Sequence, residues 1–164
     1  MDDVATPPNH VDYRRARFTT RLPGERLYTA SHFWLSAVDG GSAWRVGFTK
    51  FATRMLGDMV DYGFEVAAGD AVSVGAIIGW MEGFKAITDL YAVVNGTFRG
   101  SNPALEKNLD LLRADPYGAG WLYEAAGTPE ATALDVRGYV NILNGVIDGM
   151  LAGESMPPEV SRER

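Results

Sequence analysis

Lys85 is the residue of this sequence whose setting best favours covalent chemistry. It lies with Gly83 in a short segment between two apolar runs, residues 74–80 and 87–94, a pattern typical of two antiparallel strands joined by a tight turn. A lysine at such a tip is held out in water, and the small Ala86 beside it leaves both amine and backbone open to another enzyme. Position alone is more typical of a plain solvated charge, and the alternative is a site of covalent modification.

The rest of the sequence offers little catalytic chemistry of its own. It contains no cysteine, which excludes disulfides, thiol nucleophiles and thiolate metal sites. We find no dinucleotide-binding glycine motif, no Walker loop, no HExxH motif, and no pair of carboxylates that we can assign to one face for acid–base work. His32 cannot build a metal site without further ligands, so we expect it to be packed or hydrogen-bonded. These observations predict a carrier whose partners catalyse, not an enzyme.

Length and charge limit the classes of protein further. A chain of 164 residues with 46% hydrophobic side chains forms one domain with a substantial core. Its 15 basic and 21 acidic residues give a net charge of −6, which repels nucleic acid and anionic membrane surfaces. The sequence has no run of about 18 apolar residues, so we expect no membrane span and a cytoplasmic protein.

Strands and one short helix are expected to lead up to the lysine. Alternating apolar residues over 26–50 predict two antiparallel strands. Residues 49–56 are a helical candidate that Thr49 could cap and Gly57 could end. Further strands are expected over residues 59–76. The lysine turn is therefore expected to be part of a mainly β scaffold.

Two more helices are expected after the lysine turn. One begins at Asn102 and the other at Thr128, because each is a capping residue followed directly by proline. The last helix should run to about Ala152 with one apolar face. Three glycines inside it each weaken it by about 1 kcal/mol, so it should depend on packing against the strands.

The two ends of the chain are expected to lie outside the domain, which we place at residues 25–152. Residues 1–24 read as a polar and basic N-terminal leader, with an acidic, proline-containing start and four arginines. The Arg14-Arg15 pair is not a twin-arginine signal, because no apolar segment follows it. We expect a mobile or surface-draped arm, with a docking element for a partner as the alternative, and a frayed C-terminal tail at residues 153–164.

Several segments, in order, resemble one known family. Residues 82–92 (EGFKAITDLYA) resemble the lipoyl-attachment stretch of the glycine cleavage H proteins, which have a Glu-Ser-Val-Lys-Ala-type turn. The other similar segments are 28–34 (YTASHFW), 46–49 (VGFT), 56–60 (LGDMV), 102–106 (NPALE) and 115–122 (DPYGAGWL). The resemblance covers the chain from about Tyr28 to Met150.

The resemblance implies a fold, a cofactor and a site. The fold would be mainly β with flanking helices (α+β): a flattened lipoyl/biotinyl-type β-barrel sandwich hybrid with the lysine at a hairpin tip and the C-terminal helix packed on the barrel. Lipoate would be amide-linked to Lys85 as a swinging arm. Glu82 corresponds to the acidic residue that a lipoate-protein ligase would read, or is a solvated rim charge, and Gly83, Phe84 and Ala86 complete the attachment turn. Biotin carriers usually place methionine on each side of the lysine, so Phe84 and Ala86 fit lipoate better.

The sequence also departs from the family around this turn. Phe33 stands where H proteins usually have Glu, Gly83-Phe84 replaces a small residue and Val, and Val93 replaces a Pro. These changes lie around the tip and the face that partner enzymes would contact. They resemble a divergent branch, the lipoate-binding proteins linked to heterodisulfide-reductase-like sulfur oxidation.

We therefore favour a lipoyl carrier that works with a heterodisulfide-reductase-like complex in sulfur oxidation. One alternative is a glycine cleavage H protein that shuttles methylamine between glycine decarboxylase, aminomethyltransferase and dihydrolipoamide dehydrogenase. The other is an unmodified H-like structural or regulatory module in which Lys85 is a plain surface lysine.

Overall fold

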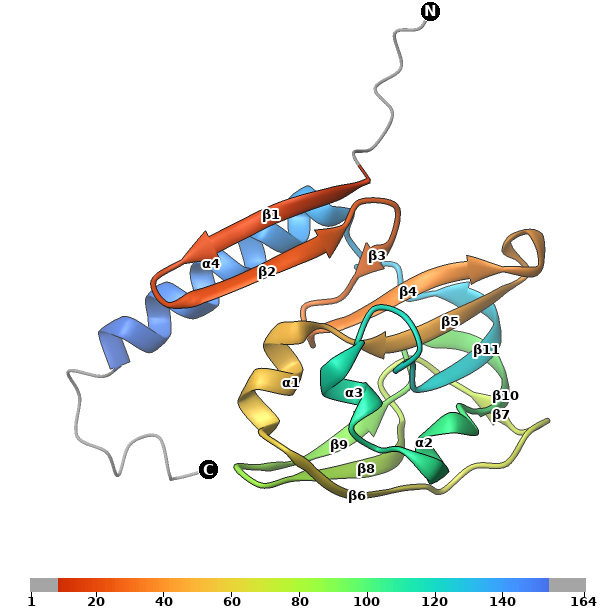
Figure 1. The fold of residues 1–164 in the computed structure, drawn as a ribbon. Helices are drawn as coiled ribbons and strands as arrows, with labels where there is room; N and C mark the ends of the chain where they lie inside the picture. Colours follow the sequence, from red (N-terminus) through yellow and green to blue (C-terminus); the bar gives the residue numbers. More distant parts are fainter. Residues whose placement is uncertain (1–8, 154–164) are drawn as a thin grey trace, which may run out of the picture.

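Two antiparallel sheets enclose the main core of the protein, whose computed structural model describes residues 9–153 (Figure 1). The larger sheet contains, in spatial order, β3 (Leu27–Tyr28), β4 (Phe33–Val38), β5 (Ala43–Phe48), β11 (Tyr123–Pro129), β10 (Val94–Ser101) and β7 (Ala71–Val72). The smaller sheet contains β6 (Met59–Phe64), β8 (Ile77–Gly83) and β9 (Ile87–Tyr91). A single 3₁₀ turn, η1 (Asp39–Gly41), joins β4 to β5.

Apolar side chains from both sheets meet in one core. Leu35 and Val46 of the larger sheet and Met81 and Leu90 of the smaller sheet are fully buried in the same cluster. Alternate residues of a strand point to opposite faces, and β4, β5 and β11 accordingly contribute residues two positions apart: Phe33 and Leu35, Val46 and Phe48, and Tyr123 and Ala125. The predicted mainly β fold with flanking helices is confirmed.

Within residues 9–153, four helices flank the sheets: α1 (Lys50–Leu56), α2 (Ala104–Lys107), α3 (Leu111–Ala114) and α4 (Val136–Gly153). Helix α1 matches its prediction, because the Thr49 hydroxyl oxygen accepts a hydrogen bond from the Ala52 N–H at 3.4 Å and Gly57 follows the last turn. The helix expected from Asn102 is divided into two short helices. Among the described residues, no helix has the length and apolarity needed to cross a membrane.

The predicted start of the last helix was wrong. Residues up to Pro129 belong to β11, where Val94 of β10 is paired with Pro129, and α4 begins only at Val136. The sheet pairing therefore overrides the local capping signal at Thr128. The first half of α4 packs on the strands as predicted, with the Tyr139 ring stacked on that of Tyr28 at a centroid distance of 4.8 Å.

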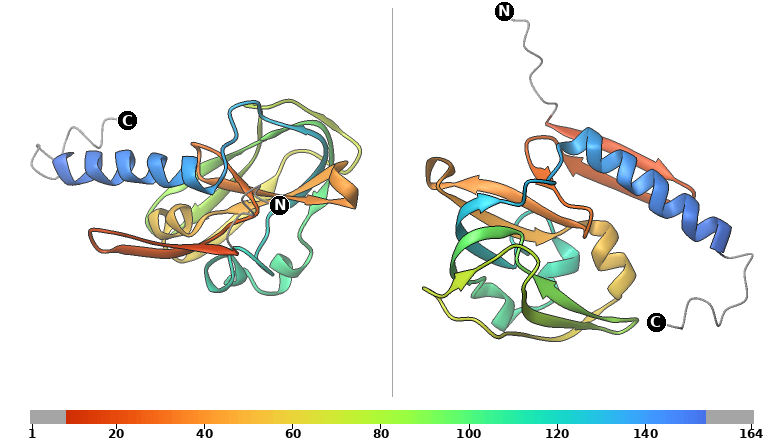
Figure 2. Two further views of the ribbon diagram at one scale, coloured as in Figure 1. Left: turned by 90° about the horizontal axis from the view of Figure 1, so that it is seen from above. Right: turned by 180° about the vertical axis from the view of Figure 1, so that it is seen from behind.

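A third, two-stranded sheet lies along α4. It consists of β1 (His10–Arg15) and β2 (Phe18–Pro23), and Figures 1 and 2 show it beside the helix from each direction. Its Tyr13, Phe18 and Leu22 side chains are buried in a second core cluster shared with α4. Residues 10–23 therefore belong to the folded unit, where the sequence analysis expected an arm outside it.

Polar contacts fix the hairpin to α4. The Tyr13 hydroxyl donates to Asn144 Oδ1 at 2.8 Å, and Arg15 Nε donates to Asp148 Oδ1 at 2.8 Å. Residues 1–8 of the expected leader and residues 154–164 of the expected tail lie outside the described residues.

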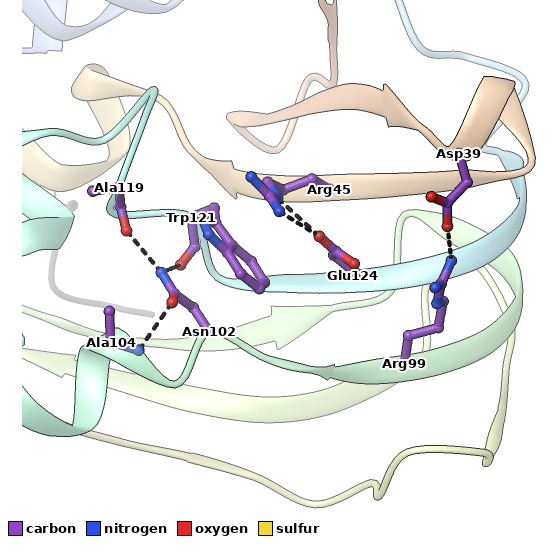
Figure 3. Close-up of polar contacts among 8 residues, drawn as sticks. All are labelled: Asp39, Arg45, Arg99, Asn102, Ala104, Ala119, Trp121 and Glu124. Carbon is purple, nitrogen blue, oxygen red and sulfur yellow. Dashed lines mark hydrogen bonds and ion pairs between the residues drawn. The ribbon is translucent and has the colours of Figure 1, made fainter.

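Side-chain contacts also join strands and loops of the larger sheet (Figure 3). Arg45 of β5 pairs with Glu124 of β11 at 2.7 Å. The buried Asn102 amide donates to the carbonyls of Ala119 and Trp121 at 2.8 and 2.9 Å, and its oxygen accepts from the Ala104 N–H at 3.0 Å. Asn102 thereby fastens the α2–α3 segment to the residues that lead into β11.

Substitution of Leu22 tests whether the N-terminal hairpin is part of the fold. Leu22 is fully buried, and truncating such a leucine to alanine costs about 2–5 kcal/mol. We expect Leu22→Ala to lower the free energy of unfolding in urea by this amount, and Thr19→Ala, an exposed position on the same strand, to change it by less than about 0.5 kcal/mol. Equal stability of the two variants would show that the hairpin does not pack on α4.

Candidate functional site

Lys85 lies at the tip of the β8–β9 hairpin, as predicted. Glu82 is paired with Ile87, and the Gly83 N–H donates to the Ala86 carbonyl at 2.8 Å, which closes the turn. The side chains of Phe84, Lys85 and Ala86 are exposed, while Glu82 is half-buried. The amine is therefore accessible on a short turn between paired strands.

The tip is also fixed by hydrogen bonds to the corner between α1 and β6. The Lys85 N–H donates to the Leu56 carbonyl at 2.8 Å, and the Phe84 N–H donates to the Asp58 carbonyl at 2.7 Å. The tip sits so close to this corner that a Cβ on Gly83 would lie 2.2 Å from the Leu56 oxygen. These contacts hold the backbone of the lysine in a defined position, while its side chain is exposed.

The corner itself needs a glycine. Gly57 ends α1 with φ of +79°, and a Cβ at this position would meet Lys85 Cγ at 2.9 Å. Only glycine adopts this backbone conformation readily and leaves this space. The local sequence predicts Gly57 as a helix end but does not predict its contact with the lysine. The only sequence signal for this contact is the LGDMV segment at residues 56–60, which is one of the segments that resemble the family.

Apolar side chains surround the lysine on the outer surface. Phe84 is 84% exposed and Ile87 is 70% exposed. Both side chains lie within two residues of the exposed Lys85, and exposed apolar patches are typical of surfaces that bind other proteins.

A recess of about 310 Å³ lies beside the tip, between α1, β9 and the segment that contains His32. The exposed Asp89 lines it, together with Phe33 and Tyr91. No lysine or arginine lines this recess within the described part of the chain. It therefore favours an uncharged or cationic group over an anion.

His32 has a structural place beside this recess. Its Nδ1 lies 2.8 Å from the Tyr139 hydroxyl, which shares a second hydrogen bond of 2.8 Å with Thr49 Oγ1. Burial lowers the pKa of His32 to about 4, since an imidazolium loses its hydration there. The expectation of a packed, hydrogen-bonded histidine is confirmed, and the Tyr139 hydroxyl joins α4 both to His32 and to Thr49 at the start of α1.

Within residues 9–153, no group of three or more His, Cys, Asp or Glu side chains is arranged to hold a metal ion. The chemistry that the site offers is that of one accessible primary amine. An antiparallel scaffold that presents one amine on a fixed tip has the geometry that a carrier protein needs to present a covalently bound group.

Comparisons with known proteins give the family. The family model described as glycine cleavage H-protein matches residues 26–135. The chain is 40% identical over 127 residues to the glycine cleavage system H protein of Corynebacterium jeikeium, which covers 73% of this chain and 95% of that protein. The corresponding protein of Beutenbergia cavernae is 36% identical over 129 residues, with 76% and 98% covered.

A solved structure agrees with this result. The crystal structure of a glycine cleavage system H protein from Mycobacterium marinum matches with a TM-score of 0.67 and 35% identity, and covers 76% of this chain and 99% of that one. The chain belongs to the glycine cleavage H-protein family, and is a carrier protein rather than an enzyme. The hairpin β1–β2 precedes the residues that the family model matches, and α4 follows them.

Alanine at Gly83 should disturb the tip. Its Cβ would overlap the Leu56 carbonyl, and such overpacking costs about 1–3 kcal/mol. Gly145, in α4, has open space around it, so alanine there should stabilise the helix by about 0.5–1 kcal/mol. We expect the midpoint temperature of thermal unfolding to be lower for Gly83→Ala and higher for Gly145→Ala than for the wild type. Unchanged stability of Gly83→Ala would contradict the close approach of residue 83 to the Leu56 carbonyl.

His32 should make stability fall in mild acid. Above pH about 6.5 the imidazole is neutral in both the folded and the unfolded chain. As the pH falls toward the folded pKa of about 4, the unfolded chain takes up the proton first, so the free energy of unfolding drops by up to about 1.4 kcal/mol per pH unit. Urea titrations from pH 7 to pH 4 should show this slope reduced in His32→Asn and retained in His10→Asn; the same slope in His32→Asn would refute the assignment.

Proposed function

We propose that this protein is a lipoyl carrier in which lipoate is amide-linked to Lys85. The observation that carries the proposal is the exposed amine on a tip whose backbone is fixed to the carbonyls of Leu56 and Asp58. Membership of the glycine cleavage H-protein family supports it. In this proposal a lipoate-protein ligase recognises the turn around the amine, which includes the exposed Phe84 and the half-buried Glu82.

The amide bond would change the chemistry of the site. It removes the positive charge of the lysine and adds a flexible chain that ends in a cyclic disulfide, which can be reduced, loaded and reoxidised. The protein contains no cysteine of its own, so all thiol chemistry would belong to the arm. A fixed base with a mobile arm raises the concentration of the reactive end at several active sites in turn.

We further propose glycine decarboxylase, aminomethyltransferase and dihydrolipoamide dehydrogenase as its partners. The relatives reported above are named glycine cleavage system H proteins, which favours the methylamine alternative over the sulfur-oxidation pathway that the sequence analysis preferred. The recess beside the tip supports this choice, because Asp89 lines it and no basic side chain of the described residues does. A methylamine-loaded arm carries a positive charge and would be attracted there.

Sulfur oxidation with a heterodisulfide-reductase-like complex is the second candidate. Phe33, which lines the same recess, occupies the place where the family usually has Glu, and so removes one attraction for a cation.

Intact mass tests the attachment site directly. After co-expression with a lipoate-protein ligase, we expect one lipoyl group on the wild-type chain and none on Lys85→Arg, because a guanidinium is not acylated. The chain has only two other lysines, Lys50 and Lys107, and Lys107→Arg should still be loaded completely. Loading of Lys85→Arg, or an unmodified wild-type chain beside a loaded control carrier, would contradict the proposal.

Reconstitution then separates the pathways. With purified glycine decarboxylase and aminomethyltransferase, the loaded protein should support release of CO₂ from glycine, and Lys85→Arg should not. A loaded protein that remains inactive with these enzymes, while a control H protein is active, would favour the sulfur-oxidation candidate.

A further inference from the structure

A second and larger groove, of about 830 Å³, opens beside the lysine. Its walls come from the turn between β1 and β2 at residues 15–18, from α1, and from the last turns of α4. Figures 1 and 2 show α1 between this hairpin and the tip of β8–β9. Lys85 itself lines the groove, so a chain attached to its amine can enter without movement of the tip.

The groove has the size and the surface of a binding site. Small-molecule sites typically enclose about 300–1,000 Å³ and are mainly apolar. Here Met55 of α1 is 42% exposed, and Met150 and Leu151 of α4 are 42% and 47% exposed. These side chains line the groove beside the buried Phe18 and Phe51 rings. They offer an apolar surface that residues 9–153 leave uncovered.

The charged side chains of the groove are all basic. Arg15, Arg17 and Arg54 line it, and no acidic residue of the described part of the chain does. Arg15 is held by Asp148 at 2.8 Å. Arg54 lies over the Phe18 ring at 5.9 Å, and neither Arg17 nor Arg54 pairs with a carboxylate within residues 9–153. The two guanidinium groups can therefore meet an anion in the groove.

The charge of this groove is opposite to that of the smaller recess. The recess on the other side of α1 is lined by Asp89 and by no basic side chain among the described residues. Phe51 and Met55 line both, so the helix divides them. An arm on Lys85 has two positions within reach that differ in the charge they favour.

We infer that the groove is a docking position for the reduced lipoyl arm of Lys85, and that Arg17 and Arg54 favour the thiolate form of this arm over an arm with a cationic group. The inference rests on the proposed carrier function. Two electrons and two protons, supplied by an external reductant, convert the cyclic disulfide into two thiols, and nearby guanidinium groups favour loss of a thiol proton. The hairpin that precedes the family match thus provides a position for the unloaded arm.

The reactivity of the arm tests this inference. The lipoylated full-length chain is reduced with a phosphine and alkylated with iodoacetamide over a range of pH, and the product is measured by intact mass. Because the chain has no cysteine, alkylation reports only the arm. We expect alkylation near pH 7 to be roughly five-fold faster in the wild type than in the Arg17→Glu/Arg54→Glu double variant.

Arg14→Glu is the matched control. Arg14 is exposed on β1 between the inward-facing Tyr13 and Arg15, so the same kind of charge reversal, at one arginine instead of two, is made on the opposite face of the hairpin. This variant should react like the wild type. Equal rates in all three proteins, or an equal loss in Arg14→Glu and the double variant, would overturn the inference.

Amide hydrogen exchange locates the arm independently of its reactivity. Residues 15–18 and 147–151 should exchange about five-fold more slowly when the reduced arm is carboxymethylated, which makes its end anionic, than when it is aminoethylated, which makes it cationic. The inference would be overturned if residues 15–18 and 147–151 were equally protected without any arm and lost this protection when residues 154–164 are removed. In that case the groove would be occupied by residues 154–164 and not by the arm.

A variant without lipoate separates this inference from the carrier proposal. Lys85→Cys would carry the only thiol of the chain, and can be alkylated with a chain of about ten atoms that ends in a carboxylate or an amine. Protection of residues 147–151 by the carboxylate chain alone supports the groove even if the ligase does not load Lys85. The absence of protection by either chain overturns it even if Lys85 is lipoylated.

Discussion

Two backbone hydrogen bonds between the lysine tip and the corner after α1 hold the site together. They run from the Lys85 and Phe84 N–H groups to the carbonyls of Leu56 and Asp58. A hairpin of two strands alone is marginally stable, and a long lysine side chain at its end would have no fixed origin. The contacts with α1 give it one. The requirement for glycine at residues 57 and 83 follows from the same close approach.

Helix α1 is therefore the element on which several parts of the molecule converge. Its end supports the tip, its buried Phe51 contacts the hairpin through the Phe18 ring at a centroid distance of 5.5 Å, and its capping Thr49 shares a hydrogen bond with Tyr139 of α4. The helix also separates a recess with a carboxylate from a groove with arginines. An arm that carries a positive group and an arm that carries a negative group would thus find different surroundings on the two sides of this seven-residue helix.

The parts of this arrangement that depend on neighbouring residues could be predicted from the sequence. The turn around Lys85 and the Thr49 cap are local patterns, and the structure contains both. The N-terminal hairpin could not be predicted in this way. Its inward residues Tyr13, Phe18 and Leu22 are separated by arginines and threonines, and Tyr13 bonds to Asn144, 131 positions away. The composition of these residues indicated an arm outside the domain. The segment is instead a structural element, because its apolar side chains are buried against α4, which is distant in the sequence.

The start of α4 shows the same limit. Thr128 followed by Pro129 is a good local signal for a helix, yet pairing with β10 keeps these residues in a strand. The groove beside Lys85 could not be predicted from local patterns either. Its walls include residues near both ends of the described chain, which only the fold brings together. The lysine itself was found because turn and family resemblance agreed on one residue.

A crystal structure of the protein purified after co-expression with a lipoate-protein ligase tests the central claim most directly. The account predicts continuous density for a lipoyl amide from Nζ of Lys85, with the tip still bonded to the carbonyls of Leu56 and Asp58. A bare Lys85 with lipoate on Lys50 or Lys107, or a tip detached from α1, would contradict it.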